Sequence, residues 1–278
     1  MSFPGVDALC CPHCGGALTD GERRLSCEEG HAFDLARQGY APLVGAHSNL
    51  TTGDDAGQVQ ARQDFLAGGL YEPFLEPIRA AAAVDAPGVA LDIGCGTGYY
   101  LADVLHRTGR TGVGLDSSKY ALRRAAKAHP ALGAVLADAW RGLPLSDDSA
   151  AVVLNVFAPR NAVDIHRVLH PEGVLVTVTP DPEHLEPLPK FVRMLQPQER
   201  KEDKLIESLS SHFERSARVP VHFETPIDRK TVHTILAMGP TARHYGPEEL
   251  RRAVDDTVPE TIDLTVSVTV STWLPASL

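Results

Sequence analysis

Short apolar runs alternate with amphipathic segments through the middle of this chain. The runs are rich in valine, leucine and alanine, and they lie near residues 88–94, 111–116, 134–138, 151–157 and 174–179. Apolar runs of this length predict buried strands, and the amphipathic segments between most of them predict crossover helices. The pattern therefore predicts an α/β fold built on a doubly wound, mainly parallel sheet.

The C-terminal part shows other patterns. Residues 262–273 alternate apolar with polar side chains, which predicts a long strand with one solvent-facing side. Before that strand we expect a helical stretch near 190–215, an extended segment at 219–225, and helices around 229–237 and 247–255.

The region before the first strand is also helical. Residues 58–83 have apolar side chains at helical spacing, interrupted by Gly68, Gly69 and Pro73, and predict two lead-in helices. Residues 45–57 are small and polar and predict a flexible connector.

A glycine-rich loop follows the first predicted strand. Residues 91–98 read Leu-Asp-Ile-Gly-Cys-Gly-Thr-Gly, and a dinucleotide-binding loop would need a glycine in place of Tyr99. The spacing resembles the S-adenosylmethionine (SAM) loop of class I methyltransferases, whose last strand is antiparallel. Asp92 precedes the loop, and Asp116, at the end of the next strand, can accept hydrogen bonds from the ribose hydroxyls. The loop glycines that we expect at the cofactor are Gly94, Gly96 and Gly98.

Polar residues also end the next strands, where ligands bind in open α/β sheets. Asp138 and the N–H of Ala139 can contact the adenine, although Asp138 can instead be an ordinary helix N-cap. After the fourth strand, Asn155 can hydrogen-bond an acceptor base and Phe157 can stack on it. The alternative is that Phe157 only completes a buried strand.

The cysteines predict a zinc site. Four of the five lie within residues 10–27, and a cytoplasmic chain keeps thiols reduced. A CxxC knuckle is followed by a third cysteine after twelve residues and by a histidine after three more, which gives a Cys3His ligand set for one structural zinc ion. The four ligands are Cys11, Cys14, Cys27 and His31. In this assignment Cys10 and His13 are not ligands.

Composition and charge are those of a cytoplasmic enzyme without a membrane span. The chain has 278 residues, 43% of them hydrophobic, and we find neither a signal-like N-terminus nor an apolar stretch of membrane-spanning length. A net charge of -10 argues against indiscriminate nucleic-acid binding. A basic row of Lys119, Arg123 and Lys127 is either a local phosphate contact or a solvated helix face.

Several motifs together resemble one family over nearly the whole chain. The zinc ligands are followed by Phe33-Asp34, Gln38-Gly39-Tyr40, Gln60-Ala61-Arg62 and Leu70-Tyr71-Glu-Pro73, then by the glycine loop and Ala158-Pro159. This combination is similar to the RlmA-type 23S rRNA (guanine-N1)-methyltransferases. Residues 155–161 are most similar to the actinobacterial tylosin-resistance branch.

The resemblance implies transfer of a methyl group from SAM to N1 of a guanine in a hairpin loop of 23S rRNA domain II, and a role in macrolide resistance. It also implies RNA recognition by the zinc module and a homodimer. The cofactor contacts that it implies are Tyr71, Gly96, Thr97 and His184.

Guanine N1 carries a proton at neutral pH, so the reaction needs a proton acceptor. Asp54 or Asp55 can serve if the connector folds over the cleft, and Arg160 can donate to the base edge. Two other classes stay open: a small-molecule SAM methyltransferase, and a SAM-fold protein that only binds RNA.

We expect three segments: a zinc-binding RNA-recognition module at 1–45, a linker with lead-in helices at 46–83, and a methyltransferase domain at 84–278. We also expect the methyltransferase domain to have a core of its own. It should then stay folded without zinc, and deleting residues 1–45 should leave SAM binding nearly intact.

Overall fold

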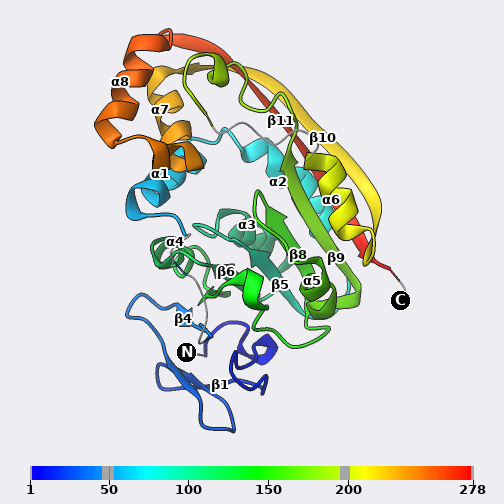
Figure 1. Cartoon of the computed structure of the whole chain (residues 1–278). Coiled ribbons are helices and arrows are strands. Elements are labelled where there is room, and N and C mark those ends of the chain that lie inside the picture. The colour runs from blue at the N-terminus through cyan, green and yellow to red at the C-terminus, as the bar shows by residue number, and fades with distance from the viewer. Residues whose placement is uncertain (1, 46–49, 51–52, 195–200, 277–278) are drawn as a thin grey trace.

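The computed structural model describes residues 2–45, 50, 53–194 and 201–276. Its centre is an eight-stranded sheet with the order β10-β11-β9-β8-β5-β6-β7-β4 (Figure 1). All strands from β4 to β9 in that order are parallel, whereas β11 is antiparallel to both β9 and β10. The mixed sheet is the one predicted for a class I methyltransferase.

The five predicted central strands are all present, within two residues at most boundaries. Only the start of the fifth differs more, because it extends upstream to residue 169. The strands are β5 (Val89–Ile93), β6 (Gly112–Asp116), β7 (Leu132–Leu136), β8 (Ala150–Val156) and β9 (Leu169–Pro180). The helices between them are α3 (Tyr99–Thr108), α4 (Lys119–Ala125) and α5 (Ala162–Val168). Because α4 ends at Ala125, the predicted basic row does not continue along the helix to Lys127.

The lead-in helices and the late helices are confirmed. The first group comprises α1 (Ala56–Ala67), the short η3 (Glu72–Phe74) and α2 (Leu75–Ala82). The second comprises α7 (Arg229–Met238), η6 (Pro240–His244) and α8 (Pro247–Thr257). In Figure 1, α7 lies beside α1 and α8 lies beside α7, so the two groups meet at one end of the molecule.

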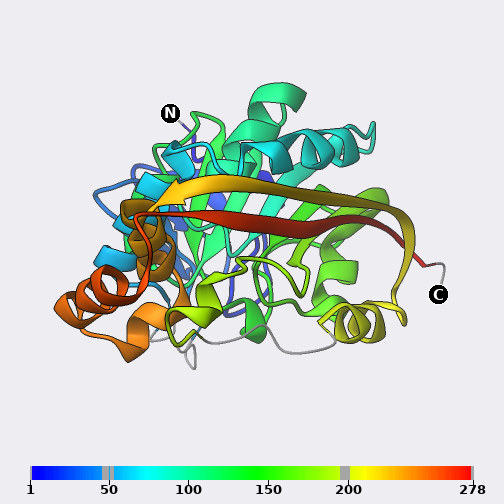
Figure 2. The ribbon, with the colours of Figure 1, turned by 90° about the horizontal axis from the view of Figure 1, so that it is seen from above.

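Two long strands run side by side along the sheet, as Figure 2 shows: β10 (Phe213–Asp228) and β11 (Thr261–Pro275). The expected extended segment at 219–225 is therefore only the middle of a longer edge strand. Most of β10 is exposed, so no apolar run marks its ends. The helix expected near 190–215 is reduced to η5 (Leu188–Lys190) and α6 (Lys201–Leu209), and residues 195–200 lie outside the described part.

The N-terminal segment has its own small sheet. It contains η1 (Val6–Ala8) and the antiparallel strands β1 (Thr19–Gly21), β2 (Arg24–Ser26) and β3 (Ala32–Asp34). The next strand, β4 (Ala41–Pro42), leaves this sheet and pairs in parallel with β7, with Ala41 opposite Val135. The N-terminal segment thus supplies an edge strand of the large sheet.

The expected separate core is wrong, because one apolar cluster spans the N-terminal segment and the large sheet. It joins Leu9 and Phe33 to Val113, Val135 and Leu145. Backbone contacts reinforce this packing: residues 9 and 145 form a β-bridge, and the amide of residue 146 donates to the carbonyl of residue 8. Unfolding of either part must expose apolar surface of the other.

In the described part of the chain, no helix is both long enough and apolar enough to cross a membrane.

Candidate active site and metal centre

A cavity of about 600 Å³ opens at the carboxyl ends of the central strands. The segments that line it are the glycine loop, the ends of β6 and β7, the loop after β8, and residues of α1 and α7. This is the position where open α/β sheets bind ligands. Ten of the predicted site residues line it: Asp54, Tyr71, Asp92, Gly94, Gly96, Thr97, Asp116, Asp138, Ala139 and Phe157.

The glycine loop has the shape of a cofactor cradle. Gly94 has φ 75°, and a Cβ there would lie 2.7 Å from the Cβ of Ala158, so a side chain would push the loops apart. Gly96 has φ 54°, and its N–H donates to Asp116 Oδ2 at 2.9 Å. Gly98 does not line the cavity; it packs against α4 and begins α3.

Two backbone hydrogen bonds hold the carboxylate of Asp116 at the cavity wall. Besides the bond from Gly96, the N–H of Ser118 donates to Asp116 Oδ1 at 2.7 Å. Burial raises the pKa of Asp116, and these two bonds act against that rise. Each carboxylate oxygen keeps a further lone pair, so the group can still accept ribose hydroxyls.

Asp92 is a buried carboxyl that faces the cavity without a partner. Neither of its oxygens has a hydrogen bond to any residue that the structure describes. Burial, together with the nearby charge of Asp116, raises the pKa of Asp92 to about 8. A buried, unpaired carboxyl fits a cationic ligand group, and the methionine part of SAM carries an ammonium group.

Asp138 combines its two predicted roles. Its side chain caps η4 (Ala139–Arg141) by accepting from the N–H of Trp140 at 3.1 Å, and it also lines the cavity with Ala139. The cap holds the carboxylate in place, and a carboxylate has lone pairs left for a ligand.

Tyr71 lines the cavity and His184 supports it from behind. The Tyr71 hydroxyl lies 2.9 Å from His184 Nε2, and the N–H of Ser267 donates to His184 Nδ1 at 3.3 Å. With Nδ1 accepting, a neutral His184 carries its proton on Nε2 and donates it to Tyr71. Burial raises the pKa of Tyr71, so the phenol stays protonated. His184 itself is not among the cavity-lining residues, so any influence on a cofactor passes through Tyr71.

The loop after β8 presents Phe157 to the cavity and turns Asn155 away from it. Phe157 has φ 53°, an unusual value for a bulky residue, and its side chain is 39% exposed. Its ring lies 5.8 Å from the ring of Tyr71. Asn155 is buried, does not line the cavity, and donates from Nδ2 to the carbonyl of Pro159 at 2.9 Å. Asn155 is therefore placed to hold the loop, whereas Phe157 can contact an acceptor.

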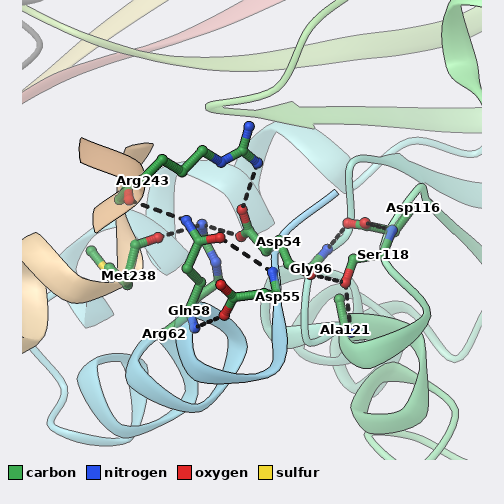
Figure 3. A network of polar contacts seen from close by, with 11 residues as sticks. Asp54, Asp55, Gln58, Arg62, Gly96, Asp116, Ser118, Ala121, Met238 and Arg243 are labelled. Carbon is green, nitrogen blue, oxygen red and sulfur yellow. Dashed lines mark hydrogen bonds and ion pairs between the residues drawn. The ribbon is translucent and has the colours of Figure 1, made fainter. Parts of the chain in front are cut away.

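The described end of the connector lies at the cavity and contacts α1 and the loop after β6 (Figure 3). Asp54 Oδ2 lies 2.8 Å from Arg62 Nη2, and the carbonyl of Asp54 accepts from the hydroxyl of Ser118. Asp55 caps α1 in a capping box with Gln58. Residues 53–57 are thus ordered rather than a flexible connector, and residues 46–49 and 51–52 lie outside the described part. Asp55 serves as a helix cap, which leaves Asp54 as the carboxylate of this pair at the cavity.

The four predicted zinc ligands converge. Their ligand atoms all lie within 4.8 Å of one another. Cys14 Sγ is 3.6 Å from Cys27 Sγ, and Cys27 Sγ is 3.3 Å from His31 Nδ1. A tetrahedron with Zn–S bonds of about 2.3 Å has S···S edges of about 3.8 Å, so the group fits zinc. Cys10 lies outside the group, and His13 is exposed with its ring stacked on Phe33.

Comparisons with known proteins agree with both sites. Residues 9–49 match the RlmA N-terminal zinc-ribbon family, and residues 90–173 match a methyltransferase domain family. The chain is 41% identical to the 23S rRNA (guanine(748)-N(1))-methyltransferase of Streptomyces fradiae, over 97% of this chain and 98% of the relative. The chain belongs to this family of 23S rRNA (guanine-N1)-methyltransferases. A second relative of the family, from Micromonospora griseorubida, is 39% identical over 96% of this chain and 97% of its own length.

A solved structure supports the fold alone. The YcgJ protein of Bacillus subtilis is 16% identical, with a TM-score of 0.51, and the match covers 74% of this chain and 100% of that one. The family resemblance, the class I methyltransferase fold and the zinc-ribbon motif predicted from the sequence are confirmed.

The sequence analysis did not name Arg62, Trp140 or Arg141 as site residues, although all three line the cavity. Arg62 pairs with Asp54 and also donates to the carbonyl of Met238 on α7, which ties α1 to α7 beside the cavity. Trp140 and Arg141 follow Asp138 in η4 and line the cavity as well. Arg62 is part of the Gln60-Ala61-Arg62 motif, and a tryptophan directly after a cofactor-binding pair was a usable signal for the others.

Proposed function

We propose that this protein transfers the methyl group of SAM to N1 of a guanine in 23S rRNA. The observation that carries the proposal is the single cavity in which the glycine loop, Asp116 and the exposed ring of Phe157 meet. The relatives named for this reaction cover nearly the whole chain, so the proposal extends to the zinc ribbon as well.

The cofactor half of the cavity has a group for each part of SAM. Asp116 would accept the ribose hydroxyls, Asp138 and Ala139 would contact the adenine, and Asp92 would receive the ammonium group. When bound, SAM supplies a methyl group on a positive sulfonium, which needs an in-line nucleophile rather than an acid catalyst. Tyr71 lies between the two halves of the cavity, with its ring near that of Phe157 in the acceptor half. Its hydroxyl contacts His184, which does not line the cavity.

The acceptor half binds the guanine against Phe157. Asn155 is a positioning residue that holds the loop through Pro159. Transfer to N1 forms an N–CH3 bond, breaks the S–CH3 bond and releases the N1 proton. Asp54 takes that proton, because the other three carboxylates that line the cavity belong to the cofactor half.

The finer assignments rest on the family. We infer that the guanine lies in a hairpin loop of domain II and that methylation protects the ribosome from tylosin-type macrolides. A ribosomal RNA substrate implies a cytoplasmic location. We also infer a homodimer, for which the exposed outer edge of β10 offers a pairing surface. Sedimentation velocity tests the dimer, and the tylosin sensitivity of cells with and without the protein tests the resistance role.

The test of the proposed function is methylation of a transcribed domain II hairpin with labelled SAM. Digestion and mass spectrometry should return 1-methylguanosine, and reverse transcriptase should stop at the modified base, because an N1 methyl blocks Watson–Crick pairing. Asp116→Ala should bind SAM at least about 30-fold more weakly, for a loss of roughly 2 kcal/mol or more. A product methylated at N7 or on the exocyclic amine contradicts the proposal.

A further inference from the structure

A second cavity, of about 520 Å³, lies beside the cofactor cavity and against the zinc knuckle. The knuckle, residues 10–15, forms one wall, and residues 137–147, which follow β7, form the facing wall. Ala137, Asp138 and Arg141 line both cavities, so the two cavities share a wall. The proposed function gives the second cavity no role.

Two arginines line the second cavity: the guanidinium of Arg167 is held by ion pairs, and that of Arg141 is not paired with a described residue. Arg167 Nε lies 2.7 Å from Asp164, its Nη1 lies 2.8 Å from Asp147, and it also donates to two backbone carbonyls. Arg141 is exposed, and its guanidinium has no hydrogen bond or ion pair with the residues that the structure describes. An unpaired guanidinium is a ready partner for a phosphate group.

The acids that line this cavity already have partners. Asp147 pairs with Arg167, and Asp138 accepts from the N–H of Trp140. These partners partly offset the negative charges of the two aspartates. Among the arginines that line the cavity, Arg141 is therefore the one that can pair with an anionic ligand.

Each of the two cavities that Arg141 lines also has an exposed aromatic ring in its lining. Trp140 is 64% exposed and lines the cofactor cavity, whereas the other tryptophan of the chain, Trp273, is buried. On the knuckle wall, the exposed ring of His13 is stacked on Phe33, with centroids 5.7 Å apart and planes 11° apart. Unpaired RNA bases stack on such rings, while arginine contacts the backbone.

We propose that the second cavity binds a nucleotide next to the target guanine, and that Arg141 contacts the phosphate that joins the two. This inference rests on the proposed function and specifies how the RNA strand is held. Because Arg141 lies on the shared wall, it is placed where a strand must cross from one cavity to the other. Trp140 stacks on the RNA at the mouth, and His13 contacts the neighbouring base from the knuckle.

The test combines protein variants with altered hairpins. Arg141→Ala should raise the KM for the hairpin about tenfold, one charge-assisted contact's worth, while the Kd for SAM changes less than twofold. Arg141→Lys should restore part of the loss. Arg252→Ala is the matched control, since Arg252 is an exposed arginine on α8, away from both cavities.

A coupling measurement identifies the nucleotide. His13→Ala should raise the KM for the intact hairpin about fivefold and should keep its zinc, because His13 is not in the ligand group. On a hairpin with an abasic site at one flanking position, the same variant should have no further effect on the KM, because the substitution and the abasic site remove the same contact. Independent, multiplying effects at both flanking positions overturn the inference. Normal methylation by the unaltered protein would meanwhile preserve the proposed function, whereas failure to methylate any 23S transcript overturns both.

Discussion

We expect Asp92 to affect both cofactor binding and protein stability. A carboxyl buried without a partner is costly when it is charged, which is why its pKa is raised. A cation bound beside Asp92 stabilises the ionised carboxylate, so the same group then favours ligand binding. Without a ligand, the protein is therefore less stable than it would be with an apolar or amide residue in place of Asp92.

The pH dependence of stability follows from this residue. An unfolded aspartate titrates near 3.9, and folded Asp92 titrates at about 8, so the folded protein holds a proton that the unfolded chain has released between these values. The contribution of Asp92 to the free energy of unfolding thus falls as the pH rises from about 4 to about 8. Asp92→Asn should gain stability relative to the unaltered protein over this range, as measured by urea unfolding at pH 5, 7 and 8.5.

The binding of SAM should show the opposite sign. Because an ammonium group favours the carboxylate, the Kd of the unaltered protein should tighten as the pH rises from 6 to 8.5, and Asp92→Asn should lose this dependence. Equal pH profiles for the two proteins, in both unfolding and binding, would mean that Asp92 is ionised throughout.

We expect substitutions of Phe157 and Asn155 to affect the acceptor rather than the cofactor. Removing the ring by Phe157→Ala should lower kcat/KM for the hairpin by about 5-fold to 150-fold, the equivalent of roughly 1–3 kcal/mol of stacking, and Phe157→Tyr should keep most activity. Asn155→Ala should lower kcat by releasing the loop from Pro159. Calorimetry should find SAM affinity nearly unchanged in all three; a larger loss of SAM affinity than of turnover would move both residues to the cofactor side.

At the scale of elements, the sequence predicts the strands that are buried on both faces, but it predicts the edge strands only in part or not at all. β5 to β8 read as apolar runs because helices and the N-terminal segment cover them. β10 is mostly exposed, so the sequence predicts only its middle, residues 219–225, and β4 is two residues long and has no pattern to detect.

The site residues also fall into those that the sequence predicts and those that it does not. The zinc ligands and the glycine loop are local motifs, so their spacing alone predicts them. The roles of Asn155 and Phe157 depend on the positive φ at Phe157, which breaks the alternation of β8 and decides which side chain faces the cavity. Arg62 reaches the cavity through tertiary packing of α1, whereas Trp140 lies there because it directly follows Asp138 and Ala139 in η4.

The docking of the N-terminal segment onto β7 can be tested at one glycine. A Cβ at Gly133 would lie 2.1 Å from the carbonyl oxygen of Pro4, so Gly133→Ala must displace backbone. We expect a loss of about 1–3 kcal/mol in the free energy of unfolding. Gly246→Ala is the control, because a Cβ there meets nothing within 4 Å. Equal unfolding curves for the two variants would show that the segment does not rest on β7.

At the scale of the whole molecule, the shared core links the metal to the methyltransferase domain. Cys11, Cys27 and Phe33 belong to the same apolar cluster as Val113 and Val135. The zinc ribbon therefore packs against the sheet and supports it, and a metal that stabilises the ribbon also stabilises the sheet.

Loss of zinc should accordingly weaken the whole protein. Cys27→Ser should lose the metal and lower the unfolding temperature of the entire chain by roughly 5–10 °C, for a loss of about 3 kcal/mol, with weaker SAM binding. Cys10→Ser should keep one zinc per chain and the original unfolding temperature. Deleting residues 1–45 should likewise impair SAM binding. A truncated chain that binds SAM normally would restore the independent domain expected from the sequence.

The pairing of β4 with β7 also sets an order for biosynthesis. The zinc ligands leave the ribosome early, and the ribbon can close on its metal at once, but the partners of Phe3, Leu9 and Ala41 are translated only with β6 and β7. Until Val135 emerges, the nascent chain carries an exposed apolar face that no local segment covers. A chain truncated before Val135 should therefore expose this apolar face and should aggregate more readily than the full chain.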